Sequence, residues 1–208
     1  MSKAYIVAGT DTGIGKTTVA AMLTLALDAF YWKPIQSGTA EGTDRAHVQA
    51  LTRLPDDRFL PERFVLTQPL SPHRAAELDG IAIQPEALTL PASDRTLIVE
   101  GAGGLLVPIT RSKLQIDVFA DWALPLILCA RTGLGTINHA LLSIEALRSR
   151  HMRLHGLIFV GDDNPDNMRT IAEFSGDRIL GHVPRLDRID RAALLEVFAG
   201  GFRREDFV

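Results

Sequence analysis

Short apolar runs alternate along the chain with longer segments whose apolar residues recur at helical spacing. The runs are typical of buried strands, because they are rich in β-branched and aromatic residues and hold few polar positions. Six strands are predicted, at residues 4–8, 30–33, 96–100, 126–130, 157–160 and 178–184. Helices are predicted at residues 16–27, 44–52, 114–122, 136–150, 165–174 and 190–198. This alternation predicts an α/β fold in which a mostly parallel sheet has helices on both faces.

Residues 55–91 interrupt the alternation. The stretch is rich in proline and has no clear apolar period, so it is either a long excursion from the sheet or a helical insertion. No change in composition marks it as a linker between two cores. We therefore expect a single domain over residues 1–208.

Amino-acid composition says little about the fold, but it limits the classes of binding partner. The 22 Lys and Arg against 25 Asp and Glu give a net charge of −3, which favours neither nucleic acid nor an anionic membrane as a partner. No apolar stretch is long enough to span a bilayer, and the first residues enter a strand pattern in place of a cleavable signal. The single cysteine, Cys129, lies in an apolar run, where a buried and inert thiol is expected. A cytoplasmic protein is the expectation.

A glycine-rich segment at residues 9–18 follows the first strand directly and opens the first helix. Such a loop aims successive N–H groups at phosphate oxygens, and the helix N-terminus adds its dipole. Lys16 would place a positive charge at the β- and γ-phosphates, and the Thr17 hydroxyl would ligate Mg2+. The segment predicts that ATP or a similar nucleotide binds with Mg2+ on a fold of the P-loop NTPase type. Five residues separate Gly9 from Gly15, one more than the usual four.

Three other residues lie at predicted strand or helix ends where they can face the same ligand. Glu100 ends an apolar strand and precedes small residues, which is how this class of fold presents a carboxylate to magnesium. Lys33 ends the second predicted strand and can face the phosphates, or it is a surface lysine at a turn. Asp44 is either a magnesium ligand or, as its more usual role, a helix-capping acid.

A further candidate anion site lies at residues 133–139, where two glycines and a threonine start a helix after the fourth strand. Asn138 and His139 can read a ligand there, although a capping threonine and solvated first-turn side chains explain them equally well. His73, within residues 71–76, is open to the same two interpretations.

Together these segments resemble the dethiobiotin synthases. The resemblance rests on residues 9–17, 33–38, 71–76, 100–108 and 133–139, in the order found in that family. It implies a cyclo-ligase of biotin biosynthesis that uses ATP and CO2 or bicarbonate to convert 7,8-diaminopelargonate into dethiobiotin. A carbamate formed on one amine would attack the γ-phosphate, and the second amine would displace phosphate from the mixed anhydride.

The resemblance also implies roles for individual residues, a homodimer and small-molecule substrates. The catalytic residues would be Lys16 and Lys33. Nucleotide contacts would come from Gly13, Ile14, Gly15, Lys16, Thr17, Thr18, Glu100, Gly101, Ala102, Gly103, Pro184, Arg185 and Leu186. Substrate contacts would come from Thr12, Ser37 and Asn138, the last across the dimer interface. The ligands of Mg2+ would be Thr17, Asp44 and Glu100.

The chain departs from the family pattern at two positions that bear on the nucleotide. Gly13 stands where glutamate is common, and Asp162 follows the fifth strand where an adenine-reading asparagine is common. Two other classes share such an ATP domain. Amide synthases of the cobyrinic-acid type carry a further amidotransferase domain, for which 208 residues leave no room. Switch ATPases of the partition type carry a lysine near the start of the loop, where this chain has Asp11.

Overall fold

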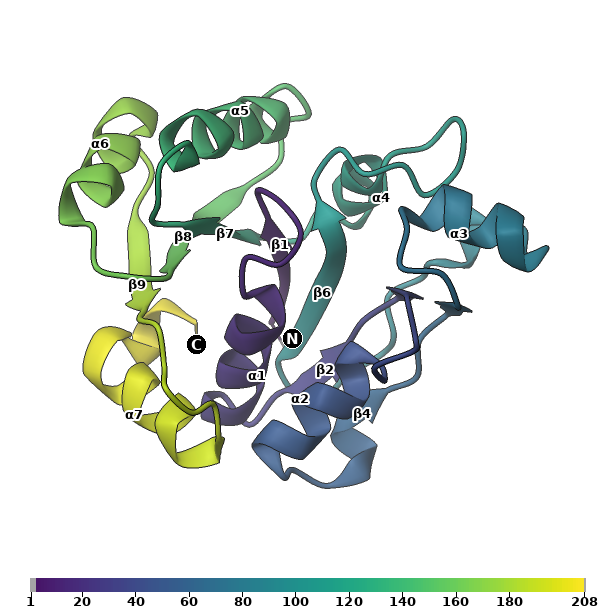
Figure 1. The fold of residues 1–208 in the computed structure, drawn as a ribbon, viewed down its shortest axis with the longest axis horizontal. Helices are drawn as coiled ribbons and strands as arrows, with labels where there is room; N and C mark the ends of the chain where they lie inside the picture. Colours follow the sequence, from purple (N-terminus) through teal and green to yellow (C-terminus); the bar gives the residue numbers. More distant parts are fainter. Residues whose placement is uncertain (1–2, 208) are drawn as a thin grey trace.

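The computed structural model describes residues 3–207, and a seven-stranded sheet forms its centre (Figure 1). Every pairing in this sheet is parallel. In sheet order the strands are β4 (Phe59–Leu60), β2 (Phe30–Trp32), β6 (Leu97–Gly104), β1 (Ala4–Gly9), β7 (Leu126–Arg131), β8 (Leu154–Val160) and β9 (Ile179–Val183). The order places β1 centrally, so the loop that follows it opens at the middle of the edge where ligands bind in such sheets.

Helices cover both faces of the sheet, as predicted. One face carries α1 (Lys16–Ala26), α2 (Asp44–Thr52) and α7 (Arg191–Gly201), which lie against one another around α1. The other face carries α4 (Gln115–Trp122), α5 (Thr136–Arg148) and α6 (Pro165–Ser175). In Figure 1, α1 lies in front of β1. The helices α5 and α6 lie next to each other on the side of β7 and β8 away from α1. No helix within residues 3–207 combines the length and the apolar character needed to cross a membrane.

Two apolar clusters, one on each face, hold the layers together. Side chains alternate along a strand, so Tyr5 and Val7 of β1 join the cluster beneath α1, while Ile6 and Ala8 join the cluster beneath α4 and α5. All four are buried. Burial on both faces explains why these strands appear in the sequence as continuous apolar runs. Cys129 of β7 lies fully buried in the first cluster, as expected.

Residues 55–91 form an excursion that also contributes to the sheets. The strand β4 pairs with β2 at the edge of the main sheet, and β5 (Phe64–Leu66) pairs with β3 (Ile35–Ser37) in a small second sheet. The segment also contains a short helix, α3 (Pro72–Asp79), which packs on a third apolar cluster. Three-residue 3-10 turns occur at Asp56–Arg58, Pro85–Ala87 and Arg204–Asp206. Both alternatives for this stretch were therefore incomplete, because two- and three-residue strands are too short to show a period.

The helix α2 has the predicted bounds, and the other predicted elements are present with ends shifted by one to four residues. The strand predicted at residues 96–100 is longer in the structure, where β6 continues through the small residues to Gly104. Glu100 therefore lies inside a strand and not at its end. Asn164 caps α6 by accepting from the Asn167 backbone N–H, and Pro165 occupies the first helical position, as its sequence predicts.

Candidate active site

The loop between β1 and α1 depends on glycine at two positions. A side chain at Gly9 would bring its Cβ to 2.6 Å from Cδ1 of Ile14. Gly15 has a φ of 93°, and a Cβ there would lie 2.7 Å from Cγ1 of Val160. Gly15 also precedes α1 without any side chain capping that helix. The N–H groups of the first helical turn are thus available to an anion.

Lys16 lies folded back on this loop. Its ammonium donates to the carbonyl oxygen of Asp11 over 2.7 Å, and the residue is buried. Burial lowers the pKa of Lys16 below its usual value, although the nearby Glu100 carboxylate opposes the shift. A phosphate would offer this cation a stronger, charged acceptor than a backbone carbonyl.

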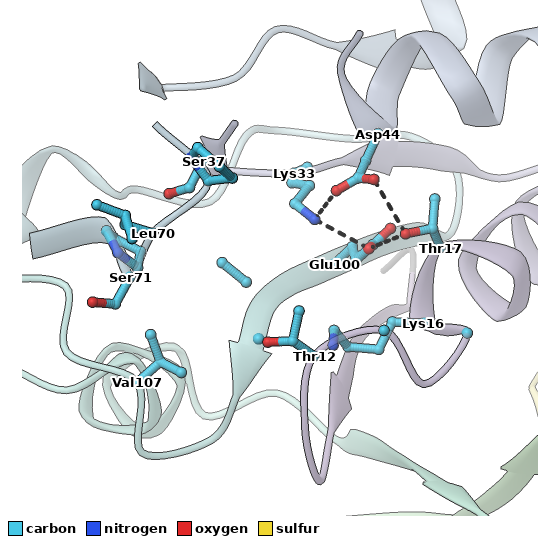
Figure 2. Close-up of a pocket in the computed structure, with 16 residues that line it drawn as sticks. Thr12, Lys16, Thr17, Lys33, Ser37, Asp44, Leu70, Ser71, Glu100 and Val107 are labelled. Carbon is cyan, nitrogen blue, oxygen red and sulfur yellow. Dashed lines mark hydrogen bonds and ion pairs between the residues drawn. The ribbon is translucent and has the colours of Figure 1, made fainter. Parts of the chain in front are cut away.

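A second polar centre joins α1, α2, β6 and the end of β2. The hydroxyl of Thr17 donates to Oε1 of Glu100 over 2.7 Å and lies 3.4 Å from Oδ1 of Asp44. The ammonium of Lys33 contacts Oδ2 of Asp44 and lies 3.2 Å from Oε1 of Glu100. Figure 2 shows these four side chains converging on one point of the cavity. One lysine and two carboxylates are therefore held together, with Glu100 fully buried.

Strand register explains why these side chains meet. Trp32 pairs with Val99, so Lys33 follows β2 at the level of Glu100 on β6. Since alternate residues point to the same face, Lys33 and Glu100 both face the layer of α1 and α2. Burial would lower the pKa of Lys33, but the charges of Glu100 and Asp44 and their hydrogen bonds raise it above its usual value. Lys33 is a charged residue of the site and not a surface lysine.

Asp44 does not cap α2. The N-cap is Thr43, whose hydroxyl accepts from the Ala46 backbone N–H over 3.2 Å. This leaves the Asp44 carboxylate free to meet Lys33 and Thr17. Gln36, which is buried, accepts from the Asp44 backbone N–H over 3.0 Å and fixes the start of the helix.

A cavity of about 560 Å³ contains both the loop and the polar centre (Figure 2). Eleven of the residues predicted for the site line it: Thr12, Gly13, Gly15, Lys16, Thr17, Lys33, Ser37, Asp44, Glu100, Ala102 and Gly103. The opposite wall consists of Pro69, Leu70, Ser71, Pro72 and Val107. The hydroxyl of Ser37 is buried and has no hydrogen-bond partner within the described chain.

Other predicted residues lie outside this cavity. Ile14 packs in the core beneath α1, Thr18 lies within α1, and Gly101 is buried in β6. Pro184 and Leu186 line a separate cavity beside α7. Arg185 instead pairs with Asp162 over 3.0 Å at the exposed ends of β8 and β9. Asn138 is exposed on the first turn of α5.

Two segments left open by the sequence have defined contacts. Thr136 does not cap α5, because its hydroxyl donates to the Arg131 carbonyl over 2.5 Å and closes the preceding loop. His73 lies in α3, where its Nδ1 is 3.0 Å from the hydroxyl of Ser71. His73 thus contacts a residue of the cavity wall without lining the cavity itself.

Three buried polar residues near the site were not anticipated from the sequence. Tyr31 donates its hydroxyl to Oε2 of Glu100 over 2.8 Å. Burial, followed by the charge of Glu100, raises the pKa of Tyr31 well above its usual value. Gln115 accepts from the Ala102 N–H and donates to the Gly104 carbonyl, while Gln36 binds the backbone around Asp44. In the sequence, each of these residues shows only as a polar group within a largely apolar segment. That pattern does not reveal which group it hydrogen-bonds.

The donor set suits a magnesium ion bound together with a nucleotide. Thr17, Asp44 and Glu100 provide hydroxyl and carboxylate oxygens, the donor types that Mg2+ prefers. Across residues 3–207, no group of three His, Cys, Asp or Glu side chains is placed to hold a metal. That is compatible with Mg2+, which uses one or two carboxylates and completes its shell with water and phosphate oxygens.

Comparison with solved structures supports the fold class. The septum site-determining protein MinD from Pyrococcus horikoshii OT3, complexed with Mg-ADP, superposes with a TM-score of 0.56 at 14% identity, covering 94% of this chain and 86% of that chain. A putative plasmid partition protein from Borrelia burgdorferi B31, bound to AMPPNP, gives a TM-score of 0.53 at 13% identity, with 94% and 90% covered. At such identities the likeness shows the P-loop NTPase fold alone.

Sequence relatives are far closer. The AAA domain family matches residues 3–193. The ATP-dependent dethiobiotin synthetase BioD of Rhodopseudomonas palustris strain TIE-1 is 57% identical over 208 residues, covering 100% of this chain and 98% of the relative. The protein of the same name from Novosphingobium aromaticivorans is 54% identical over 204 residues, covering 98% of each. These matches extend over essentially the whole chain, so the protein belongs to the family of ATP-dependent dethiobiotin synthetases.

Proposed function

We propose that this protein closes the cyclic urea of dethiobiotin on 7,8-diaminopelargonate, using ATP and CO2 or bicarbonate, and does so as a single domain. The observation that carries the proposal is the placement of Lys33, Asp44, Glu100 and Thr17 in one cavity with the phosphate-binding loop. Family membership gives the substrate class. The cavity supplies what phosphoryl transfer needs, which is positioning and compensating charge.

The proposed chemistry has three steps. One amine of the substrate first adds to CO2 and loses a proton, which gives a carbamate. An oxygen of the substrate carbamate attacks the γ-phosphorus of ATP, and the bond to the bridging oxygen breaks to release ADP. The second amine then attacks the carbamoyl carbon, and phosphate leaves as the ring closes. Lys16 leaves the Asp11 carbonyl to bind the β- and γ-phosphates. Lys33 stabilises the charge that spreads over the carbamate and the transferring group.

Thr17, Asp44 and Glu100 would hold Mg2+, which supplies charge neutralisation at the phosphates when it is bound. Backbone N–H groups around Gly13 and Gly15 and in the first turn of α1 would bind the phosphates, a role that also gives Ile14 and Thr18 a place in the site. Gly101, Ala102 and Gly103 would let the β6 backbone approach the ligand closely.

The remaining contacts are proposed from family membership. Thr12 and Ser37 would meet the diamine, and the unpartnered Ser37 hydroxyl supports that role. Pro184, Arg185 and Leu186 would line the base and ribose site. Asn138 would meet the substrate carboxylate across a homodimer interface, which its exposure permits. A cytoplasmic location stays a prediction from the sequence.

The deciding experiment supplies purified protein with 7,8-diaminopelargonate, 13C-bicarbonate and MgATP. We expect dethiobiotin that carries one 13C atom, formed together with one phosphate per ring. Reactions without the diamine give the background ATPase rate. Phosphate release that is independent of the diamine, with no labelled product by mass spectrometry, would refute the proposal.

A further inference from the structure

Tyr31 lies beneath the polar centre and outside the cavity. It is fully buried in β2, and its ring packs against Phe59 with 6.4 Å between the ring centroids. Tyr31 pairs with Ile98, so Glu100 lies two residues further along β6 on the same face. The phenol ring spans that offset, and its hydroxyl donates to Oε2 of Glu100 over 2.8 Å.

The two oxygens of Glu100 consequently have different partners. Oε1 faces the cavity, where it accepts from Thr17 over 2.7 Å and lies 3.2 Å from the ammonium of Lys33. Oε2 faces the core and accepts from Tyr31. A carboxylate with no exposed surface must satisfy both oxygens within the protein, and Tyr31 provides the donor on the apolar side.

We propose that Tyr31 is a positioning residue that turns a single oxygen of Glu100 toward the magnesium ion of the nucleotide complex. The inference rests on the proposed function, because it concerns how Glu100 would hold that ion. With Oε2 bonded to Tyr31, the carboxylate binds through Oε1 alone. Without the hydroxyl, the carboxylate is free to rotate about its last torsion angle, and both oxygens compete for Lys33 and Thr17.

The test compares Tyr31→Phe with the wild-type protein. Phenylalanine keeps the ring and its packing on Phe59 and removes only the donor. The matched control is Tyr5→Phe, which deletes a hydroxyl from another buried tyrosine. Tyr5 lies on β1 at the same level of the sheet as Tyr31, and its ring packs against His155 and Phe207. ADP binding is measured by calorimetry across a series of MgCl2 concentrations and also in EDTA.

We expect Tyr31→Phe to raise the Mg2+ concentration for half-maximal ADP binding by roughly ten-fold or more, the usual effect of losing a hydrogen bond to a metal ligand. Affinity for ADP in EDTA should not change, because the phosphate loop is untouched. Tyr5→Phe should match the wild type in both conditions. If Tyr31→Phe requires the same Mg2+ concentration as the wild type, the inference is wrong while the proposed function stands.

A double-variant cycle separates positioning from general packing. In a Glu100→Gln background the Tyr31→Phe change should have no further effect on Mg2+-dependent ADP binding, because the carboxylate it orients is gone. An effect that persists there would overturn the inference, and this comparison can still refute the inference if Tyr31→Phe alone does not fold. Wild-type ADP binding that is indifferent to Mg2+ would remove the metal part of the proposed function and the inference together.

Discussion

The hydroxyl of Thr17 donates to Oε1 of Glu100 over 2.7 Å, although 83 positions separate the two residues in the chain. The bond joins the first turn of α1 to β6, so the phosphate-binding loop and the carboxylate strand share one site. Lys33 and Asp44 complete that site with opposite charges. With one lysine against two carboxylates, the centre retains a net negative charge that can accept a divalent cation beside the phosphates.

Replacing Lys33 by Gln should abolish most of the synthetase activity. Lys33 is the ammonium that contacts both Asp44 and Glu100, and its loss leaves two adjacent carboxylates without a cation. We expect kcat to fall by on the order of 100-fold or more, as for removal of a donor that stabilises a developing charge. The measurement is diamine-dependent formation of dethiobiotin.

Lys113→Gln provides the control for this change, because Lys113 is a partly exposed lysine that pairs with Asp121 away from the cavity. It should retain wild-type turnover. Thermal unfolding of both variants checks that they are folded. Activity of Lys33→Gln within a few-fold of the wild type would show that its assigned role is wrong.

Replacing Gln36 by Ala should lower the stability of the protein, because Gln36 holds the backbone that positions Asp44. Its side chain accepts from the Asp44 N–H and donates to the carbonyls of Ser37 and Gly38. Leaving buried groups unpaired costs about 1–3 kcal/mol, which for a chain of this size lowers Tm by roughly 2–12 °C. The same change at Gln49, on the surface of α2, should shift Tm by less than about 2 °C. Equal shifts for the two variants would contradict the proposed support of Asp44.

The fold was predictable because its strands are apolar and its helices are long enough to show a period. Six of the seven strands of the main sheet correspond to a predicted run. The ends of β1, β2, β7 and β9 differ from the prediction by one residue, whereas β8 begins three residues earlier and β6 ends four residues later. What escaped prediction was β4, β3 and β5, whose two or three residues take their strand geometry from pairing with neighbours. Tertiary context and not local pattern decides such short elements.

Residue types in the sequence indicated most of the residues that line the cavity, but not the hydrogen bonds and ion pairs between them. Residue type indicated Lys16, Thr17 and Glu100, but only the structure shows that Thr43 and not Asp44 caps α2, which leaves the Asp44 carboxylate free for the site. Sequence spacing carries no information on which of two neighbouring residues caps a helix in a loop of unknown shape. The hydrogen bond from Tyr31 to Glu100 was not predicted for a different reason, which is that an aromatic residue in a strand usually packs in the core.

Cys129 should resist alkylation in the folded protein. It is fully buried in β7, and burial raises the pKa of its thiol to about 12. The thiolate fraction is therefore negligible at pH 8, and the reagent has no access. Mass spectrometry after treatment with iodoacetamide should show no adduct until urea unfolds the chain. Rapid labelling of the native protein would mean that β7 is far less protected than the structure indicates.

Stability should fall as the pH drops below neutrality, partly through His155. Burial lowers the pKa of His155 in the folded protein, so the unfolded chain binds a proton first as pH falls through about 6.5. The stabilising contribution is present above that value and is lost as pH falls through the lower, folded pKa. Urea unfolding between pH 5 and about 8 measures the slope.

His155→Phe should make this pH dependence less steep, since phenylalanine retains the ring contacts with Tyr5 and Phe207 and does not titrate. His151→Asn, a change at an exposed histidine whose φ of 53° asparagine tolerates, should leave the slope unaltered. A slope in His155→Phe as steep as in the wild type would assign the pH dependence to other groups.

Leu142 should lie in the proposed homodimer interface. Leu106 and Leu142 are 51% and 57% exposed, and they line one hollow together with His139 of α5. His139 is next to Asn138 in that helix, and Leu142 lies about one turn beyond Asn138. Two exposed leucines beside a proposed substrate contact favour this face for a second copy of the chain. Light scattering should give about twice the 22.7 kDa chain mass for the wild type and one chain mass for Leu142→Glu. Leu195→Glu, at a leucine of α7 that is 40% exposed on the other face of the sheet, should remain dimeric. If Leu142→Glu were dimeric as well, or the wild type monomeric, Asn138 could not reach a partner's substrate through this surface.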